Sequence, residues 1–397
     1  MSPLHKIPRG VWVLGFVSMF MDMSSELIHS LLPVFMVSSL GASVMMVGMI
    51  EGIAEAAALI IKIFSGVLSD WLGRRKGLAV FGYGLSALSK PAFALATTVY
   101  WAFFARFMDR IGKGIRGAPR DALVADMVSS NIRGAAYGLR QSLDTIGAFV
   151  GPGLAILLML YYEGDFRQVF WFATLPAILS VILLFVGISE PNSIREQGEL
   201  APPLQYSTLR QFSPAFWWVV VMGGFFTLAR FSEAFLILRA RAAGLPDTYA
   251  PVILIIMNIL YALSAYPAGK LADRIDRNYL MVAGLLVLLA ADLLLAQAHT
   301  LTSIFAGVVL WGLHMGITQG LLATMVADAS PKKLRGSGFG LFYLVSGIAM
   351  LLASLVAGVV WDMFGAAMTF YCGAGFAAIS LLLVLMRKIS PALDVGS

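Results

Sequence analysis

Five basic side chains share one face of a helix predicted over residues 99–126. They are Arg106, Arg110, Lys113, Arg116 and Arg120. At about 100° per residue they fall, together with Asp109, within roughly a 120° arc. Because arginine forks match carboxylate and phosphate groups, the stripe predicts a wall that attracts anions. The alternative is that acids on other helices neutralise most of it.

Acidic residues at helical spacing supply such partners and also the candidate proton carriers. The groups are Asp22, Glu26 and His29, then Glu51 and Glu55, then Arg140 and Asp144, and finally Arg230 and Glu233. A proton carrier must change its protonation state when water or an arginine reaches it. The predicted carriers are Asp22, Glu26, Glu55 and Asp109, each alternatively a permanent salt-bridge partner. The predicted substrate contacts are Glu26, His29, Arg106, Arg110, Lys113, Arg116, Arg140, Asp144, Arg230 and Glu233.

The chain that positions these groups is too apolar for a soluble protein. Its 397 residues are 59% hydrophobic and 13% charged, whereas a soluble chain has about 45–50% apolar and 25% charged residues. This composition excludes an ordinary soluble enzyme, a disordered chain and a nucleic-acid-binding protein. Since a membrane helix needs about 20 apolar residues, the length allows roughly a dozen spans.

Twelve hydrophobic stretches separated by polar turns predict an all-α integral membrane fold. They cover residues 11–38, 44–69, 77–97, 99–126, 134–161, 167–188, 213–239, 248–271, 278–298, 302–328, 337–361 and 366–386. An even number of spans places both termini on one side. Lysine and arginine cluster before the first span and after the even-numbered ones, which predicts a cytoplasmic location for both termini. The net charge of +6 has the same explanation.

The two halves of the chain repeat each other. GVLSDWLGR, starting at Gly66, corresponds to GKLADRIDR, starting at Gly269, and Val-Ala-Asp126 corresponds to Val-Ala-Asp328. Matches at a nearly constant offset predict two six-helix bundles in parallel orientation. The predicted bundles are residues 1–188 and 213–397, joined by a polar cytoplasmic linker over 189–212.

Together these features resemble the major facilitator superfamily of transporters. The most specific feature is GVLSDWLGRRK, which matches the superfamily's loop motif between its second and third helices. The resemblance implies a cytoplasmic latch between the halves, although signalling of membrane topology alone would also explain the charges. The implied latch residues are Gly66, Asp70, Gly73, Arg74, Arg75 and Asp126, with Asp273, Arg277 and Asp328 as their counterparts. Its basic residues could also contact anionic lipid headgroups.

A glycine-proline motif in the span 134–161 resembles one that is common in proton-coupled exporters. It consists of Gly147, Gly151 and Pro152. Glycines four residues apart allow close helix packing, and proline bends a helix. The motif favours export over uptake, while a packing seam without directional meaning is the simpler alternative.

The sequence therefore predicts a secondary transporter of the inner membrane that works by alternating access. The expected cargo is a small organic anion or zwitterion, moved outward with proton coupling. The alternatives are a proton-coupled importer of an anionic metabolite or metal chelate, and a lipid flippase or non-transporting receptor. No Walker loop, metal-ligand cluster, nucleophile triad or dinucleotide-binding loop occurs, so we expect no enzymatic activity, cofactor or metal. The resemblance implies a monomer.

Overall fold

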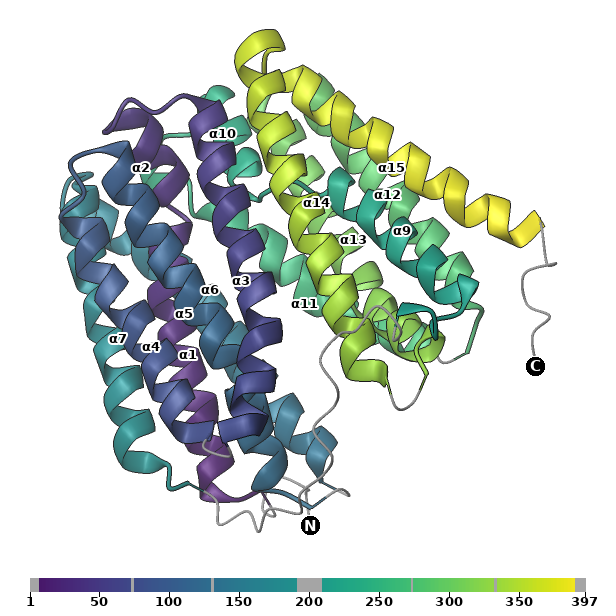
Figure 1. The fold of residues 1–397 in the computed structure, drawn as a ribbon. Helices are drawn as coiled ribbons and strands as arrows, with labels where there is room; N and C mark the ends of the chain where they lie inside the picture. The colour runs from purple at the N-terminus through teal and green to yellow at the C-terminus, as the bar shows by residue number, and fades with distance from the viewer. Residues whose placement is uncertain are drawn as a thin grey trace. The chain divides into compact units, whose positions relative to one another are not determined.

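The computed structural model describes residues 7–72, 75–129, 132–190, 209–272, 274–331 and 334–389. Every regular element in these ranges is helical (Figure 1). The elements are α1 (Arg9–His29), α2 (Leu32–Ser38), α3 (Val44–Leu72), α4 (Arg75–Ala94), α5 (Val99–Asp126), α6 (Arg133–Tyr161), α7 (Phe166–Gly187), α9 (Pro214–Ala229), α10 (Ala234–Ala242), the 3-10 turn η2 (Asp247–Tyr249), α11 (Val252–Ala272), α12 (Arg277–Gln297), α13 (Leu301–Ala329), α14 (Arg335–Phe364) and α15 (Ala366–Ile389). This confirms the predicted all-α fold.

Two of the predicted spans are broken helices. Pro33 lies in the first turn of α2, where its missing N–H interrupts the continuation of α1. Residues 230–233 likewise separate α9 from α10. Within the described residues, ten helical segments are long and apolar enough to cross a membrane. The two long helices outside this set are α4 and α5, which carry the buried basic side chains of the site.

The described residues divide into two compact units. The first draws on Met1–Ala42, Ile53–Ala201 and Pro246–Val252, and the second on Ser43–Gly52, Pro202–Leu245 and Ile253–Ser397. Of the predicted linker, only residues 189–190 and 209–212 are described. The division into bundles 1–188 and 213–397 therefore stays a prediction.

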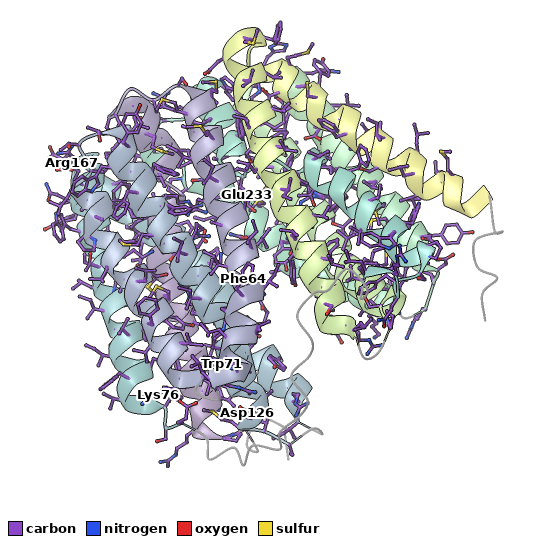
Figure 2. The ribbon with its side chains drawn as sticks, in the orientation of Figure 1. Phe64, Trp71, Lys76, Asp126, Arg167 and Glu233 are labelled. Atoms are coloured by element: carbon purple, nitrogen blue, oxygen red, sulfur yellow. The ribbon has the colours of Figure 1, made fainter. Side chains whose placement is uncertain are left out.

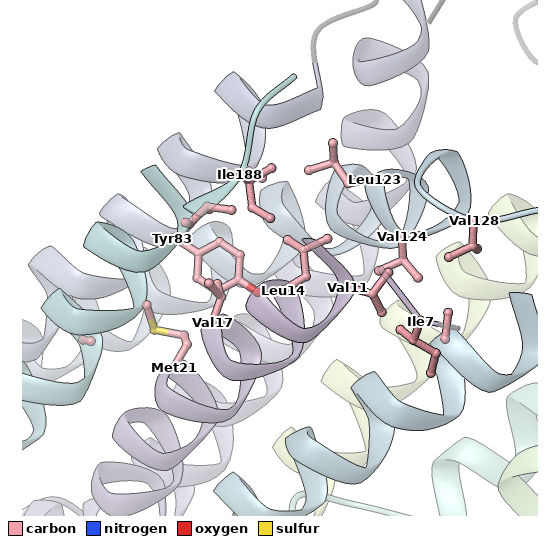
Figure 3. Close-up of a cluster of buried hydrophobic side chains, with 14 of the residues drawn as sticks. Ile7, Val11, Leu14, Val17, Met21, Tyr83, Leu123, Val124, Val128 and Ile188 are labelled. Carbon is pink, nitrogen blue, oxygen red and sulfur yellow. The ribbon is translucent and has the colours of Figure 1, made fainter. Parts of the chain in front are cut away.

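In the first unit, α1 packs against α6 and α7, and α4 packs against α5. One end of this packing is a cluster of buried apolar side chains from α1, α4, α5, α6 and α7 and the residues flanking them (Figure 3). The labelled members are Ile7, Val11, Leu14, Val17, Met21, Tyr83, Leu123, Val124, Val128 and Ile188. Lipid is as apolar as leucine, so van der Waals packing between such side chains, rather than exclusion of water, holds the helices together.

The seam between α1 and α6 depends on two glycines. A Cβ atom on Gly147 would lie 2.3 Å from the carbonyl oxygen of Met19, and one on Gly151 would lie 2.5 Å from that of Met23. Both distances are far below van der Waals contact, so only glycine allows the two backbones this close. The seam fixes the face of α1 that carries Asp22 and Glu26.

In the second unit, α12 packs between α13 and α15. The register follows from two close contacts, because Gly284 faces Thr318 and Gly307 faces Leu295.

The final carbonyl groups of α12 accept hydrogen bonds from a side chain. Arg239 of α10 donates to the carbonyl oxygens of Leu295 at 2.9 Å and Ala298 at 2.6 Å. This arginine supplies hydrogen bonds that a helix C-terminus lacks internally.

Candidate functional site

A buried carboxylate, Asp109, lies at the centre of the first unit's charge network. Its Oδ1 accepts a hydrogen bond from Lys90 Nζ at 2.8 Å, and its Oδ2 accepts one from Arg110 Nη2 at 2.8 Å. The side chains of all three residues are only 1–2% exposed. Lys90 also donates to Ser25 Oγ at 2.9 Å, which ties α4 to α1. Each charge has an opposite charge at hydrogen-bonding distance, as burial requires.

The network continues from Arg110 to Glu55 on α3. One carboxylate oxygen of Glu55 accepts hydrogen bonds from Arg110 Nη1 at 3.1 Å and from Arg106 Nη2 at 3.2 Å. Glu51, wholly buried, lies one helical turn away from Glu55. We call Lys90, Asp109, Arg110, Glu55 and Arg106 the buried charge chain, in which Glu55 has the most exposed side chain, at 29%. Acids therefore pair with Arg106 and Arg110, the first two residues of the predicted basic stripe.

Arg116, further along the stripe, is held mainly by a serine hydroxyl and an aromatic ring. Arg116 donates to Ser86 Oγ, and its guanidinium lies 4.9 Å from the centre of the Tyr83 ring. Its Nη2 is 3.9 Å from Asp22 Oδ1, a distance typical of a weak ion pair. These contacts hold Arg116 against α4, with a side-chain exposure of 3%.

Beyond Arg116, two arginines and two acids alternate. Arg120 Nη2 lies 3.0 Å from Asp121 Oδ1, and Arg140 Nε lies 3.8 Å from the same oxygen. Arg140 also pairs with Asp144 at 2.5 Å, as its i,i+4 spacing predicts. Arg120 further donates to Ser18 Oγ at 3.2 Å. The group links α5, α6 and α1 without an excess of either charge.

Lys113 differs from the rest of the stripe because its side chain is exposed. It forms no hydrogen bond or ion pair within the described part of the chain. It nevertheless lies close enough to Asp22 and Glu26 for electrostatic interaction. Glu26 Oε2 is 3.3 Å from His29 Nδ1, and the Glu26 side chain is 18% exposed. Lys113, Asp22 and Glu26 thus form the accessible part of the site.

The second unit contributes fewer charges to the predicted set. Arg230 caps the end of α9, with its guanidinium 5.5 Å from the centre of the Phe226 ring. Glu233 lies immediately before α10. In the residues described, no three His, Cys, Asp or Glu side chains come together in an arrangement that could hold a metal ion.

The two predicted latches are described only in part. Arg75 pairs with Asp126 in the first unit, and Arg277 pairs with Asp328 in the second. Figure 2 places Asp126 near Lys76, at the end of the first unit opposite Arg167. Gly73, Arg74 and Asp273, and the side chain of Asp70, lie outside the described residues. Gly66 lies beside α5, since its Cβ would be 3.4 Å from that of Ala118.

Two basic residues that hold helices together, Lys90 and Arg239, were not predicted from the sequence. Lys90 lies within the apolar stretch SALSKPAFA. A lysine in such a context needs a buried acid, so its position alone was a usable signal. Nothing comparable marks Arg239, whose acceptors are backbone carbonyls that follow from the packing of α10 against the end of α12.

Comparisons with known proteins agree with this architecture. The family model described as Major Facilitator Superfamily matches residues 14–239 and 234–395. An uncharacterized MFS-type transporter of Methanocaldococcus jannaschii, MJ1317, is 31% identical over 387 residues, covering 96% of this chain and 95% of that protein. The multidrug resistance protein MdtH of Salmonella newport is 23% identical over 364 residues, covering 89% of this chain and 87% of the relative.

A solved structure has the same fold at low sequence identity. It is a POT family transporter in complex with 5-aminolevulinic acid, with a TM-score of 0.79, 14% identity and coverage of 98% of this chain and 97% of the other. The family model, the full-length relative and the fold all lead to one conclusion. The chain belongs to the major facilitator superfamily and is a multi-pass membrane transporter.

Proposed function

We propose that this transporter exports a small organic anion or zwitterion across the inner membrane, driven by protons. The proposal rests on the exposure of Lys113 and on its lack of an ion-pair partner among the described residues. This lysine is exposed, lies on the same face of α5 as the buried arginines, and pairs with no acid among the described residues. A lysine ammonium that is not already neutralised can bind a carboxylate, sulfonate or phosphonate group.

The proton step is assigned to the acids beside Lys113. Asp22 and Glu26 lie on one face of α1, four residues apart, and the side chains are 26% and 18% exposed. Asp22 is 3.9 Å from Arg116, and the ion pair of Glu26 within the described residues is the one with His29 at 3.3 Å. An anion at Lys113 and a proton at Glu26 would therefore influence each other directly. Asp109 and Glu55, each bound by two cations, position the site in this proposal.

The glycine-proline motif in α6 supports the outward direction. Gly147 and Gly151 form the seam that fixes α1, so the motif that resembles proton-coupled exporters holds the helix with the proposed proton acids. A multidrug resistance protein among the relatives agrees with export. An importer of an anionic metabolite or metal chelate is the second candidate, because the binding groups would serve either direction.

Alternating access is the mechanism proposed for this movement. In it the latch pairs Arg75–Asp126 and Arg277–Asp328 break and re-form at the cytoplasmic side as the site changes its exposure. The termini would both be cytoplasmic, and one chain would be the functional unit.

Transport into proteoliposomes tests the proposal. Purified protein is reconstituted, and movement of labelled phenylphosphonate, benzenesulfonate, taurine and tetraphenylphosphonium is followed under a pH gradient of either sign. We expect at least one anion or zwitterion to move against the proton flux, and Glu26→Gln to remove the response to the gradient. Movement with the proton flux would support the importer, and transport of the cation alone would contradict the assignment of Lys113.

A further inference from the structure

The second unit contains a buried acid to which the proposed function assigns no role. Asp292, on α12, is 0% exposed, and neither of its carboxylate oxygens has a hydrogen-bond partner within the described residues. Both acids of the buried charge chain, Asp109 and Glu55, have cationic partners. Asp292 and Asp109 are both buried, but the charge of an ionised Asp292 would have no cationic partner among the described residues, unlike that of Asp109.

The surroundings of Asp292 are apolar on both packed sides. On α15, a Cβ on Gly373 would lie 2.9 Å from Asp292 Oδ2 and 3.0 Å from the Phe231 ring. On α13, the register set by Gly284–Thr318 and Gly307–Leu295 places Asp292 level with Leu310 and Trp311. Phe231 and Trp311 are themselves in contact, with ring centres 5.5 Å apart. The carboxyl group thus lies against Gly373, and the Phe231 ring lies beside the same glycine.

Within the described residues, no lysine, arginine or histidine forms a hydrogen bond or ion pair with Asp292. On α13 the nearest titratable group is His314, about one helical turn along, whose ring contacts Trp311 and Phe226. On α15 it is Cys372, beside Gly373. Arg239 of α10 is bound to the carbonyl groups at the end of α12, and Arg230 lies over Phe226. Arg241 and Glu233 lie in the same segment as Arg230 and Arg239, and Arg241 forms no ion pair with Asp292 within the described residues.

An ionised carboxylate without a partner is too costly in such a place, because burying an isolated charge costs far more than burying a neutral group. A metal cation would need several oxygen ligands, and no three His, Cys, Asp or Glu side chains come together among the described residues. A proton needs no further ligand and removes the charge. The carboxylic acid form is therefore the one that fits this site.

We propose that Asp292 is a proton-binding residue of the second unit, protonated in the conformation described and able to release its proton when water reaches α12 during transport. This inference rests on the proposed proton coupling and adds a second proton site to that of α1. Gly373 is the residue that admits it, since any side chain there would fill the space of the carboxyl group.

Infrared difference spectroscopy on the reconstituted protein tests the protonated state without a substrate. The carbonyl stretch of a buried carboxylic acid should be lost in Asp292→Asn and shifted in Gly373→Ala, where the new methyl group contacts Oδ2. Asp126→Asn is the control, because Asp126 is an exposed ion-pair partner whose replacement should leave folding intact, and no such band should be lost. A spectrum unchanged in Asp292→Asn would overturn the inference, and so would a band that does not respond to bulk pH.

A transport measurement separates this inference from the proposed function. Under the conditions of the proteoliposome assay, Asp292→Asn should reduce the response to the pH gradient at least tenfold while the protein still binds its anion. If wild type responds to the gradient and Asp292→Asn responds equally, the inference fails and the proposed function stands. If wild type shows no response but the infrared band titrates, the proposed coupling fails and the proton site remains.

Discussion

At the scale of single residues, the charges of α5 divide into those that hold the structure and one that is accessible. Arg106, Arg110 and Arg116 are buried against acids, a serine and an aromatic ring, whereas Lys113 is exposed between them. Removing a partner from a buried pair is costly because it leaves the other charge uncompensated. Removing an exposed charge costs little. The two lysines Lys90 and Lys113 therefore offer a direct contrast.

Replacing Lys90 by methionine should destabilise the protein strongly. Asp109 would keep Arg110 but lose one of its two cationic partners, and breaking a buried pair costs about 3–5 kcal/mol. Lys113→Met is the matched control, with an expected change in unfolding free energy within about 0.5 kcal/mol. Denaturant unfolding in detergent measures both. Equal stability of Lys90→Met and wild type would show that the pair with Asp109 contributes nothing.

Part of this network could be predicted from the sequence and part could not. The spacing of Arg140 and Asp144 was enough to predict their ion pair, and helical periodicity placed the basic stripe on one face. The exposure of Lys113 and the burial of Arg116 could not be predicted, because they depend on which neighbouring helix packs against each part of α5. Lys90, one of the two cationic partners of Asp109, comes from α4, nineteen residues earlier in the chain, and only tertiary packing brings it there.

At the scale of the elements, close approach and capping decide where the site residues lie. The all-α fold and the approximate span boundaries followed from hydrophobic stretches alone. The breaks at α1–α2 and α9–α10 were not predicted, since each predicted span reads as one continuous apolar run. In the case of α2, Pro33 was the available signal.

Enlarging Gly147 should separate α1 from α6. In Gly147→Val, the added carbons would lie within 2.3 Å of the Met19 carbonyl oxygen, so the helices must move apart. We expect poor folding yield and loss of transport. Gly153 lies in the same helix with nothing within 4 Å of its Cβ position, so Gly153→Ala should fold normally. A well-folded, active Gly147→Val protein would contradict the claim that the close packing of α1 and α6 requires glycine at this position.

Asp165 should stabilise the start of α7 in a pH-dependent way. The Gln168 amide and the backbone N–H groups of Gln168 and Arg167 donate to its carboxylate, which lowers the pKa of Asp165 below its usual range. The cap is therefore intact at neutral pH and is lost as the pH falls through that lowered pKa. Asp165→Ala should cost about 1 kcal/mol at pH 7. In Asp165→Asn, which can still cap, thermal unfolding should lose its acid dependence at this position.

At the scale of the whole molecule, the chain is a superfamily transporter in which each unit has its own salt bridge at corresponding positions. Arg75–Asp126 and Arg277–Asp328 link the starts of α4 and α12 to the ends of α5 and α13. The internal repeat predicted that Asp126 and Asp328 correspond, at an offset of 202 residues. Their arginine partners were not predicted, because the motif alignment pairs Arg277 with Arg74, whereas in the structure Arg75 pairs with Asp126. The buried charges do not follow the repeat, since the first unit holds most of them.

Breaking the first of these pairs should slow transport without impairing folding. Asp126→Asn removes an exposed ion pair, which contributes at most about 1 kcal/mol to stability, so expression and melting temperature should stay close to wild type. Transport in the proteoliposome assay should fall severalfold, and exchanging the residues in Arg75→Asp with Asp126→Arg should recover part of it. Unchanged transport in Asp126→Asn would leave the pair only a role in membrane topology.

The central claim is that an anion binds at Lys113, and a thermal-shift measurement on purified protein tests it most directly. Wild type and Lys113→Met are heated with phenylphosphonate, benzenesulfonate or tetraphenylphosphonium at two pH values. A ligand that binds only the folded state stabilises it by about 2.7 kcal/mol at a hundred times its dissociation constant. We predict that an anion raises the melting temperature of wild type and not that of Lys113→Met. Equal stabilisation of both proteins by the anion, or stabilisation by the cation alone, would contradict the claim.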